Sequence, residues 1–307
     1  EPWQLALSML LVGLQLGNTG VMLAAIRDVV PIRRLGTLIA VFGVSGPVGF
    51  ALGPLLGGFL VDGLGLPLSA IFWVSAGLSV GTALLVTFGS REVRPDVVPA
   101  GRVVDLAFGA VRGVLSDRVV RRIFAIFGIA FLASQASRPY IPVLAEQLNR
   151  DPASVASAIA LVAGTAALVG ALVSPIGGWV GDRIGFRPVL VAALVGGGLA
   201  SLAMPVVNSI PVLAITAAAL AACSAAISAM VFGLLAIDVP AERRSATLNL
   251  VYLPLYAAGI VGPTLGAVVV SAGLWAPFWL GAVIYLGGAV VASARRSRTS
   301  TVGGAVG

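Results

Sequence analysis

The chain has 307 residues, of which 59% are hydrophobic and only 10% are charged, and its formal net charge is +7. Soluble domains carry about 25% charged residues, so this chain could not cover a water-facing surface. The composition therefore excludes a soluble globular domain and predicts an integral membrane protein.

Long apolar runs follow one another along the whole chain. A helix needs roughly 20 apolar residues to cross the hydrocarbon core, and the short alternating runs of barrel strands are absent. The predicted fold class is all-α integral membrane with nine transmembrane helices. They are expected at about residues 3–27, 33–61, 67–89, 120–146, 152–181, 187–207, 211–238, 243–271 and 275–294.

The basic residues lie in alternate connections between these helices. All 19 are arginines, and if the first helix starts outside, only Arg138 and Arg150 fall toward the outer side. The positive-inside rule explains this distribution better than nucleic-acid binding does. We expect a multi-pass protein of the inner (plasma) membrane with a cytoplasmic C-terminus, in contact with the lipid bilayer and with no nucleic-acid partner.

The predicted helices form three triplets whose middle helices end in related phrases. These phrases run from Gly53 to Gly65, from Ser174 to Gly185 and from Gly262 to Gly266. The first two combine a proline, paired glycines and an aspartate, and the third keeps only the glycine–proline start. Many transporters are built from internal repeats on this scale.

A charged stretch rich in proline and glycine separates the first triplet from the other two. We expect the remainder of an N-terminal half at 1–95, a cytoplasmic linker at 96–118, a six-helix C-terminal half at 119–298 and a disordered tail at 299–307. The apolar side of residues 103–115 predicts an interfacial amphipathic helix, and a plain linker is the equal alternative.

Residues 178–187 form a tight, charged turn between two apolar runs. They resemble the cytoplasmic loop signature of the major facilitator superfamily, G-x-x-x-D-R-x-G-x-R, through Gly178, Asp182, Arg183, Gly185 and Arg187. In that family this loop braces one half of the protein against the other, so the resemblance implies a conformational lock.

The lock should involve Asp182, because an aspartate at a helix end can meet the positive N-terminus of a neighbouring helix. By repeat symmetry we expect it near residues 33–36, and a plain surface charge is the alternative. Arg183 and Arg187 are expected to pair with Asp182 or Asp238, or to contact lipid phosphates. The similar phrase at Gly58–Gly65 lies on the predicted outer side and lacks arginines, so the lock is not carried over to it.

A second motif resembles the glycine–proline signature in the fifth helix of the family's drug–proton antiporters. It consists of Gly49, Gly53, Pro54, Gly57 and Gly58. Glycines four residues apart let another helix approach closely, and proline frees a backbone carbonyl and permits a bend. Close packing alone is the competing interpretation.

The resemblance covers the whole chain and aligns it with family helices four to twelve. Because the chain starts at Glu1 and the first helix follows at once, we expect an N-terminal truncation that leaves the first triplet outside this sequence. No Asp, Glu, His or Lys lies deep in a predicted span. A proton-coupling group would therefore lie outside this sequence or be a boundary residue such as Glu146.

Few polar side chains fall within the predicted spans, and these are the candidates for a substrate cavity. For Arg138 the alternative is snorkelling to the interface, and for the others it is hydrogen bonding or packing between helices. A mostly apolar interior with a single intramembrane cation predicts lipophilic cargo. The candidates are Gln15, Asn18, Gln135, Arg138, Asn249, Tyr252 and Tyr256.

Together these features predict a monomeric secondary transporter that exports small lipophilic or drug-like molecules by alternating access. The resemblance implies multidrug efflux with proton antiport, and no cofactor or metal is expected. A non-coupled facilitator or metabolite carrier of the same fold is the alternative, and a non-transporting sensory protein is a more distant one. Without histidine or lysine, a histidine-dependent hydrolase or a Walker-type nucleotide hydrolase cannot be built, so no enzyme is expected.

Overall fold

A computed structural model describes residues 2–13, 45–46, 48–89, 111–113, 116–238 and 250–294. These residues are almost entirely helical, with no strand among them, as the predicted fold class requires. Seven helices in this part of the chain are long and apolar enough to cross a membrane, and the helix Val48–Gly63 is a shorter apolar one. The expected linker helix lies largely outside the described residues.

The helices follow the predicted spans closely wherever both are defined. In chain order they are α1 (Pro2–Gly13), Val48–Gly63 ending in the π-helical turn η1 (Phe59–Gly63), α4 (Ser69–Gly89), α6 (Arg118–Ser137), η2 (Arg138–Tyr140), α7 (Ile141–Leu148), η3 (Pro152–Ser154), α8 (Val155–Ile184), α9 (Phe186–Ala203), η4 (Met204–Val206), α10 (Ile210–Asp238), α12 (Leu253–Val269), η5 (Val270–Ala272) and α13 (Ala276–Ser293).

Local chemistry accounts for several helix boundaries. The side chain of Asp117 accepts hydrogen bonds from the backbone N–H groups of Val119 and Val120 at 2.8 and 3.3 Å, and so caps the start of α6. The span Arg118–Leu148 is broken by the 3₁₀ turn η2. Pro139 lies in this turn, where its ring and missing N–H disfavour a continuous α-helix.

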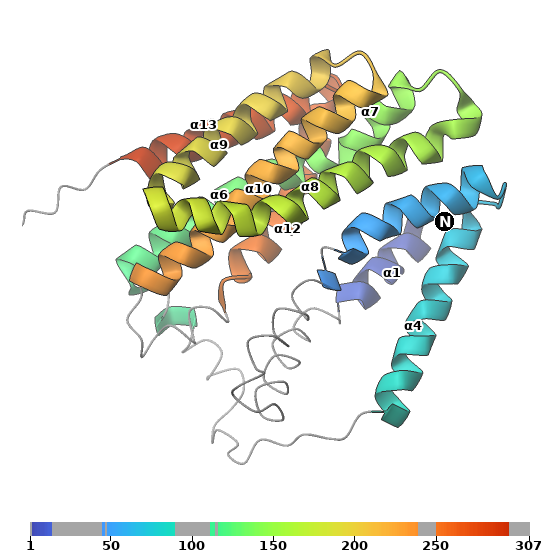
Figure 1. Ribbon diagram of the computed structural model, residues 1–307, viewed down its shortest axis with the longest axis horizontal. Coiled ribbons are helices and arrows are strands. Elements are labelled where there is room, and N and C mark those ends of the chain that lie inside the picture. Colours follow the sequence, from blue (N-terminus) through green and yellow to red (C-terminus); the bar gives the residue numbers. More distant parts are fainter. Residues whose placement is uncertain are drawn as a thin grey trace, which may run out of the picture.

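The core lies among α6, α8, α9, α10, α12 and α13, which pack as a bundle (Figure 1). Phe127, Leu194, Met230, Phe278 and Tyr285 are among its fully or almost fully buried side chains. Small residues set the spacing between helices, since lipid offers no hydrophobic drive to hold them together.

Glycines on α12 and α13 face α6 without room for a side chain. A methyl group at Gly262 would lie 2.6 Å from the Cβ of Gln135, and one at Gly281 would lie 2.9 Å from the carbonyl oxygen of Ala133. These backbones therefore approach as closely as glycine permits.

The outside of the described helices is apolar. Helix α4 has no buried residue and stands apart from the bundle (Figure 1). Trp73, Leu85 and Phe88 on this helix are more than 70% exposed, at 76%, 74% and 81%. An apolar exterior of this extent suits hydrocarbon rather than water.

Candidate functional site

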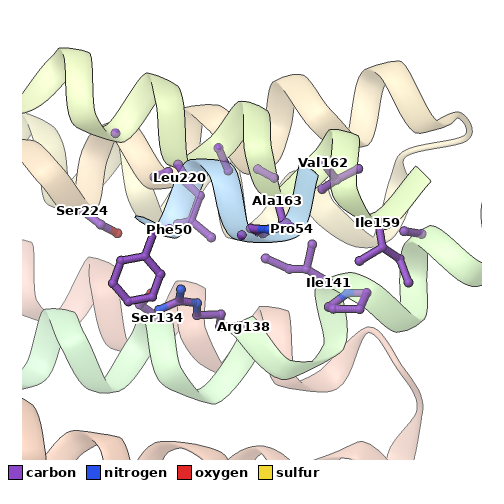
Figure 2. A pocket seen from close by; sticks show the side chains of 18 of the residues that line it. Phe50, Pro54, Ser134, Arg138, Ile141, Ile159, Val162, Ala163, Leu220 and Ser224 are labelled. Atoms are coloured by element: carbon purple, nitrogen blue, oxygen red, sulfur yellow. The ribbon is translucent and has the colours of Figure 1, made fainter. Parts of the chain in front are cut away.

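A cavity of about 730 Å³ lies between the helix Val48–Gly63 and the helices α6, α7, α8 and α10 (Figure 2). Its volume falls in the range typical of small-molecule sites, which are mostly apolar with a few polar groups. Gly49, Phe50, Gly53 and Pro54 form one wall, so most of the glycine–proline motif lines the cavity. Alanines, a glycine and branched aliphatic side chains of α8 and α10 form much of the opposite wall.

Only three of the described residues that line the cavity have polar side chains, namely Ser134, Arg138 and Ser224. Figure 2 shows Phe50 pointing toward Ser134 and Arg138 across the cavity. The guanidinium carbon of Arg138 lies 5.8 Å from the centroid of the Phe50 ring, a distance that allows a cation–π interaction. This contact joins η2 to the helix Val48–Gly63.

A side chamber of about 160 Å³ adjoins the main cavity and shares Phe131, Ser134 and Ser224 with it. There the hydroxyl groups of Ser224 and Tyr285 lie 3.1 Å apart in a hydrogen bond, and Tyr285 is fully buried. Sequence reasoning did not single out this pair. Its two members come from α10 and α13, and no local spacing connects them.

The predicted cavity residues do not all come together. Arg138 lines the cavity, whereas Gln135 packs against Gly262 of α12 and is absent from the described lining. The Oε1 atom of Gln135 is buried without a hydrogen-bond partner among the described residues. Gln15, Asn18 and Asn249 lie outside the residues that the structure describes.

The two tyrosines form part of an aromatic row. The rings of Tyr252 and Tyr256 stack with centroids 6.3 Å apart, and Tyr252 lies 6.5 Å from Phe232. Phe232 in turn meets the buried Phe127 edge-on at 6.2 Å. Neither tyrosine belongs to the described cavity lining. Tyr252 contacts α10 through Phe232, and each tyrosine is 41% exposed, so a role in cargo binding or in packing stays a prediction.

The turn expected at 178–187 is shorter in the structure: residues 178–184 belong to α8, residues 186–187 begin α9, and Gly185 alone joins the two helices. Gly185 adopts φ +97°, where a side chain would be strained, and so ends one helix and starts the next. Asp182 is exposed. Its expected neighbours at 33–36 lie outside the described residues, so the lock remains a prediction.

Among the described side chains, the two arginines of this turn contact groups other than Asp182, and the side chain of Asp238 lies outside the described ones. The guanidinium of Arg183 lies 3.9 Å from the centroid of the Trp179 ring. Arg187 donates to the carbonyl oxygens of Ala292 and Ala294 at 2.9 and 2.7 Å. Because the last carbonyls of a helix have no partner within it, Arg187 supplies the end of α13 with donors.

The glycine–proline motif changes role along its helix. A methyl group at Gly49 or Gly53 would meet nothing described within 4 Å. At Gly58 it would lie 2.6 Å from the Cβ of Ala160 and 3.1 Å from the carbonyl oxygen of Ala156. The motif thus lines the cavity at one end and packs tightly on α8 at the other.

Asp62 is a residue to which sequence reasoning gave no role. Its carboxylate accepts a hydrogen bond from the backbone N–H of Ser157, the third residue of α8. The sequence offered one relevant observation, the repeat match between the phrases that contain Asp62 and Asp182. Among the described residues no group of three or more His, Cys, Asp or Glu side chains is placed to hold a metal ion.

Membrane-spanning helices around a largely apolar cavity of small-molecule size define the class of a multi-pass membrane transport protein. The model of the Major Facilitator Superfamily matches residues 1–149 and again residues 123–305. The chain therefore belongs to the major facilitator superfamily, a family of transporters rather than enzymes.

Several curated relatives share one description. The chain is 28% identical over 194 residues to the "Multidrug resistance protein MdtG" of Citrobacter koseri, an alignment that covers 63% of this chain and 47% of the relative. The protein of that name from Enterobacter lignolyticus is 31% identical over 196 residues, covering 63% of this chain and 45% of the relative. The match thus spans about half the length of these relatives.

Proposed function

We propose that this protein exports small lipophilic molecules across the inner membrane by alternating access. The observation that carries the proposal is the cavity of about 730 Å³ between the helix Val48–Gly63 and the C-terminal bundle, in which three polar side chains are set among apolar ones. The multidrug resistance proteins to which the chain is similar support a drug-like cargo.

The lining favours cargo that makes few hydrogen bonds. A sugar would exchange many hydrogen bonds to water for the few that Ser134, Arg138 and Ser224 can offer. Each polar group left unpaired costs about 1–3 kcal/mol, so several unmet hydroxyls would cancel the gain from burial. An aromatic or aliphatic molecule loses little, and its size can vary because alanine and glycine form much of the wall.

The contact between the helix Val48–Gly63 and α8 supports a rocking movement. The two helices touch near Gly58 and Ala160 and diverge toward Gly49 and Gly53, where the cavity lies. With the C-terminus in the cytoplasm, as the arginine distribution favours, the closed end faces outward. This conformation would then be the inward-facing member of the transport cycle.

Proton antiport is the coupling we propose, by the resemblance of the glycine–proline motif to that of drug–proton antiporters. A proton-coupling group must titrate within the transport pathway. Uncoupled facilitation is the second candidate, and one observation favours it: none of the described residues that line the cavity is a carboxylate. Glu146 is exposed and not part of this lining.

Reconstitution in proteoliposomes tests the proposal with a fluorescent lipophilic dye as cargo. Ala167 lines the cavity on α8, and Ala167→Trp should fill it and lower the rate of dye movement at least about tenfold. Leu172, on the same helix, is 58% exposed, so Leu172→Trp is the matched control and should leave the rate within about twofold. Unchanged transport by Ala167→Trp would place the pathway elsewhere.

Coupling is tested in the same vesicles. An imposed pH gradient should accelerate dye movement if antiport is correct. Equal rates with and without the gradient would select the facilitator.

A further inference from the structure

We infer that Asp62 is a positioning residue that latches the outer end of the cavity, opposite in action to the lock expected at Asp182. The inference rests on the proposed alternating access. Its starting point is the hydrogen bond that the Asp62 carboxylate accepts from the backbone N–H of Ser157. This bond crosses from the helix that lines one side of the cavity to the helix that lines the other.

The start of α8 is suited to receive a carboxylate. The first N–H groups of a helix lack partners within it, and its N-terminus carries a partial positive charge. Ser154, at the N-cap of α8, makes no side-chain capping bond. Asp151 caps the preceding turn η3 locally, by accepting from the N–H of Ala153 at 3.0 Å. Asp62 therefore supplies from another helix a cap that the α8 N-cap residue does not.

The shape of the chain at Asp62 suits this contact. Asp62 belongs to the π-helical turn η1, closed by a hydrogen bond from the N–H of Leu64 to the carbonyl oxygen of Phe59 at 3.0 Å. Single π-helical turns occur frequently at functional sites. A wider turn rotates the residues at the helix end relative to the regular α-helical positions before it.

Close packing brings the same two helices together beside the bond. Gly58 is buried against Ala156 and Ala160, with no room for a methyl group. One turn further from the latch, a methyl at Gly164 would lie 2.8 Å from the Cγ of Leu55. The carboxylate thus closes an interface that glycine makes possible.

Toward its C-terminal end, α8 packs against α10. Added methyl groups at Gly170 and Gly177 would meet Ala221 and Ala226 of α10, at 3.6 and 3.4 Å to the nearest atom. Past Gly177, Asp182 lies in the last turn of α8, which ends at Ile184. Two antiparallel helices place the C-terminal end of each beside the N-terminus of the other, so an aspartate near each C-terminal end can cap its neighbour.

This arrangement assigns one carboxylate to each side of the membrane. Asp62 would hold the outer ends of the two helices together, and Asp182 would hold the inner ends together in the other conformation. A rocking movement that opens one end closes the other, so engaging one aspartate releases its counterpart. Loss of Asp62 should therefore shift the population toward the outward-open state.

Access from the outer side tests the latch without measuring transport. In a Cys223→Ala background, which removes the single cysteine, Ala163→Cys places a thiol in the cavity lining. A membrane-impermeant maleimide is then added to intact cells. Adding Asp62→Ala should raise the labelling rate roughly fivefold, the population shift expected for one lost cap. Asp62→Asn, which keeps an acceptor oxygen but no charge, should fall between.

The matched control is Asp151→Ala, which removes a carboxylate cap at the same end of α8 but not one that joins the two helices. It should leave labelling unchanged. Equal acceleration by Asp151→Ala, or none by Asp62→Ala, would overturn the latch. Asp182→Ala should slow labelling, and the double change with Asp62→Ala should return the rate toward that of the parent.

A crosslink gives a second measurement that does not depend on labelling. Leu55→Cys with Gly164→Cys places two thiols across the closed interface, and oxidation should join them readily in the parent. Asp62→Ala should slow this crosslink while Asp151→Ala should not. If both measurements behave as expected but reconstituted protein moves no dye, the latch holds and the proposed function fails. If the protein transports dye normally but Asp62→Ala changes neither labelling nor crosslinking, the proposed function holds and the latch fails.

Discussion

The guanidinium groups of Arg122 and Arg187 donate to the same carbonyl oxygen, that of Ala294, at 2.8 and 2.7 Å. Each also reaches one further carbonyl, Val291 for Arg122 and Ala292 for Arg187. Arg122 belongs to the first turns of α6 and Arg187 to the start of α9. The last turn of α13 is therefore tied to two other helices by charge-assisted bonds to carbonyls that its own helix leaves free.

Removing this pair should weaken the bundle more than removing another arginine of the same turn. We expect Arg122→Ala and Arg187→Ala each to cost about 1 kcal/mol, because each loses charged hydrogen bonds and a favourable helix-end charge. The measurement is thermal unfolding of purified protein in detergent. Arg183→Ala is the control, since Arg183 is exposed and lies over the Trp179 ring of its own helix. An equal loss from Arg183→Ala would argue against a specific role for the carbonyl contacts.

Two glycines of one motif should respond in opposite directions to alanine. Gly58→Ala forces a methyl against Ala160 and Ala156, so overpacking should destabilise the protein by about 1–3 kcal/mol. The methyl group of Gly53→Ala would meet nothing described within 4 Å, and this change should raise stability by roughly 0.5–1 kcal/mol, because alanine loses less backbone entropy in a helix. Thermal unfolding of both variants decides this, and similar effects at both sites would contradict the packing described here.

Arg138 should discriminate cargo by charge. Arg138→Ala removes a cation from the cavity lining and its contact with Phe50, worth about 0.5–1 kcal/mol at an exposed site. We expect binding of an anionic lipophilic dye to weaken about two- to fivefold, and binding of a cationic dye to strengthen. Fluorescence titration of purified protein measures both. Arg150→Ala, an exposed change beyond the cavity, should affect neither dye, and a parallel loss for both dyes in Arg138→Ala would indicate a structural effect instead.

Substitutions of Gln135 distinguish a role in packing between helices from a role in cargo binding. Its Oε1 atom is buried and unpaired among the described residues, and an unsatisfied buried polar atom costs about 1–3 kcal/mol. Gln135→Met keeps the approximate volume and should stabilise the protein by about 1 kcal/mol, with dye affinity unchanged. A loss of affinity, measured in the same titration, would return Gln135 to the cargo site. Gln135→Glu should destabilise, because it places a charge where an amide already lacks a partner.

The placement of the helices that the structure describes followed from the sequence, because membrane thickness sets the length of an apolar run. The rotation of each helix did not follow, since lipid-facing and buried sides are equally apolar. Gln135 and Arg138 are three residues apart and so were expected on one face, yet Ser134, four residues from Arg138, shares the cavity lining with it. The bonds that Arg187 makes among the described residues are to backbone carbonyls, which no residue pattern predicts.

The family resemblance identified candidate functional residues that hydrophobic periodicity could not identify. It did so only at the positions that a motif names. The arginine-free phrase at Gly58–Gly65 fell outside the lock signature, although its aspartate makes a bond between helices. Gly181, which is packed against Phe186 and Met230, also lies between the named positions of the loop. Such contacts depend on which helices become neighbours, and that is decided by the whole fold.

The connection between α8 and α9 through Gly185 alone has a mechanical consequence. A single residue at φ +97° joins α8 to α9, so the turn has little slack in which to absorb a displacement. A push on Asp182 at the end of α8 would travel through two peptide units to the start of α9, and from Arg187 into the final turn of α13. Helices α8, α9 and α13 would then tilt together as one rigid unit.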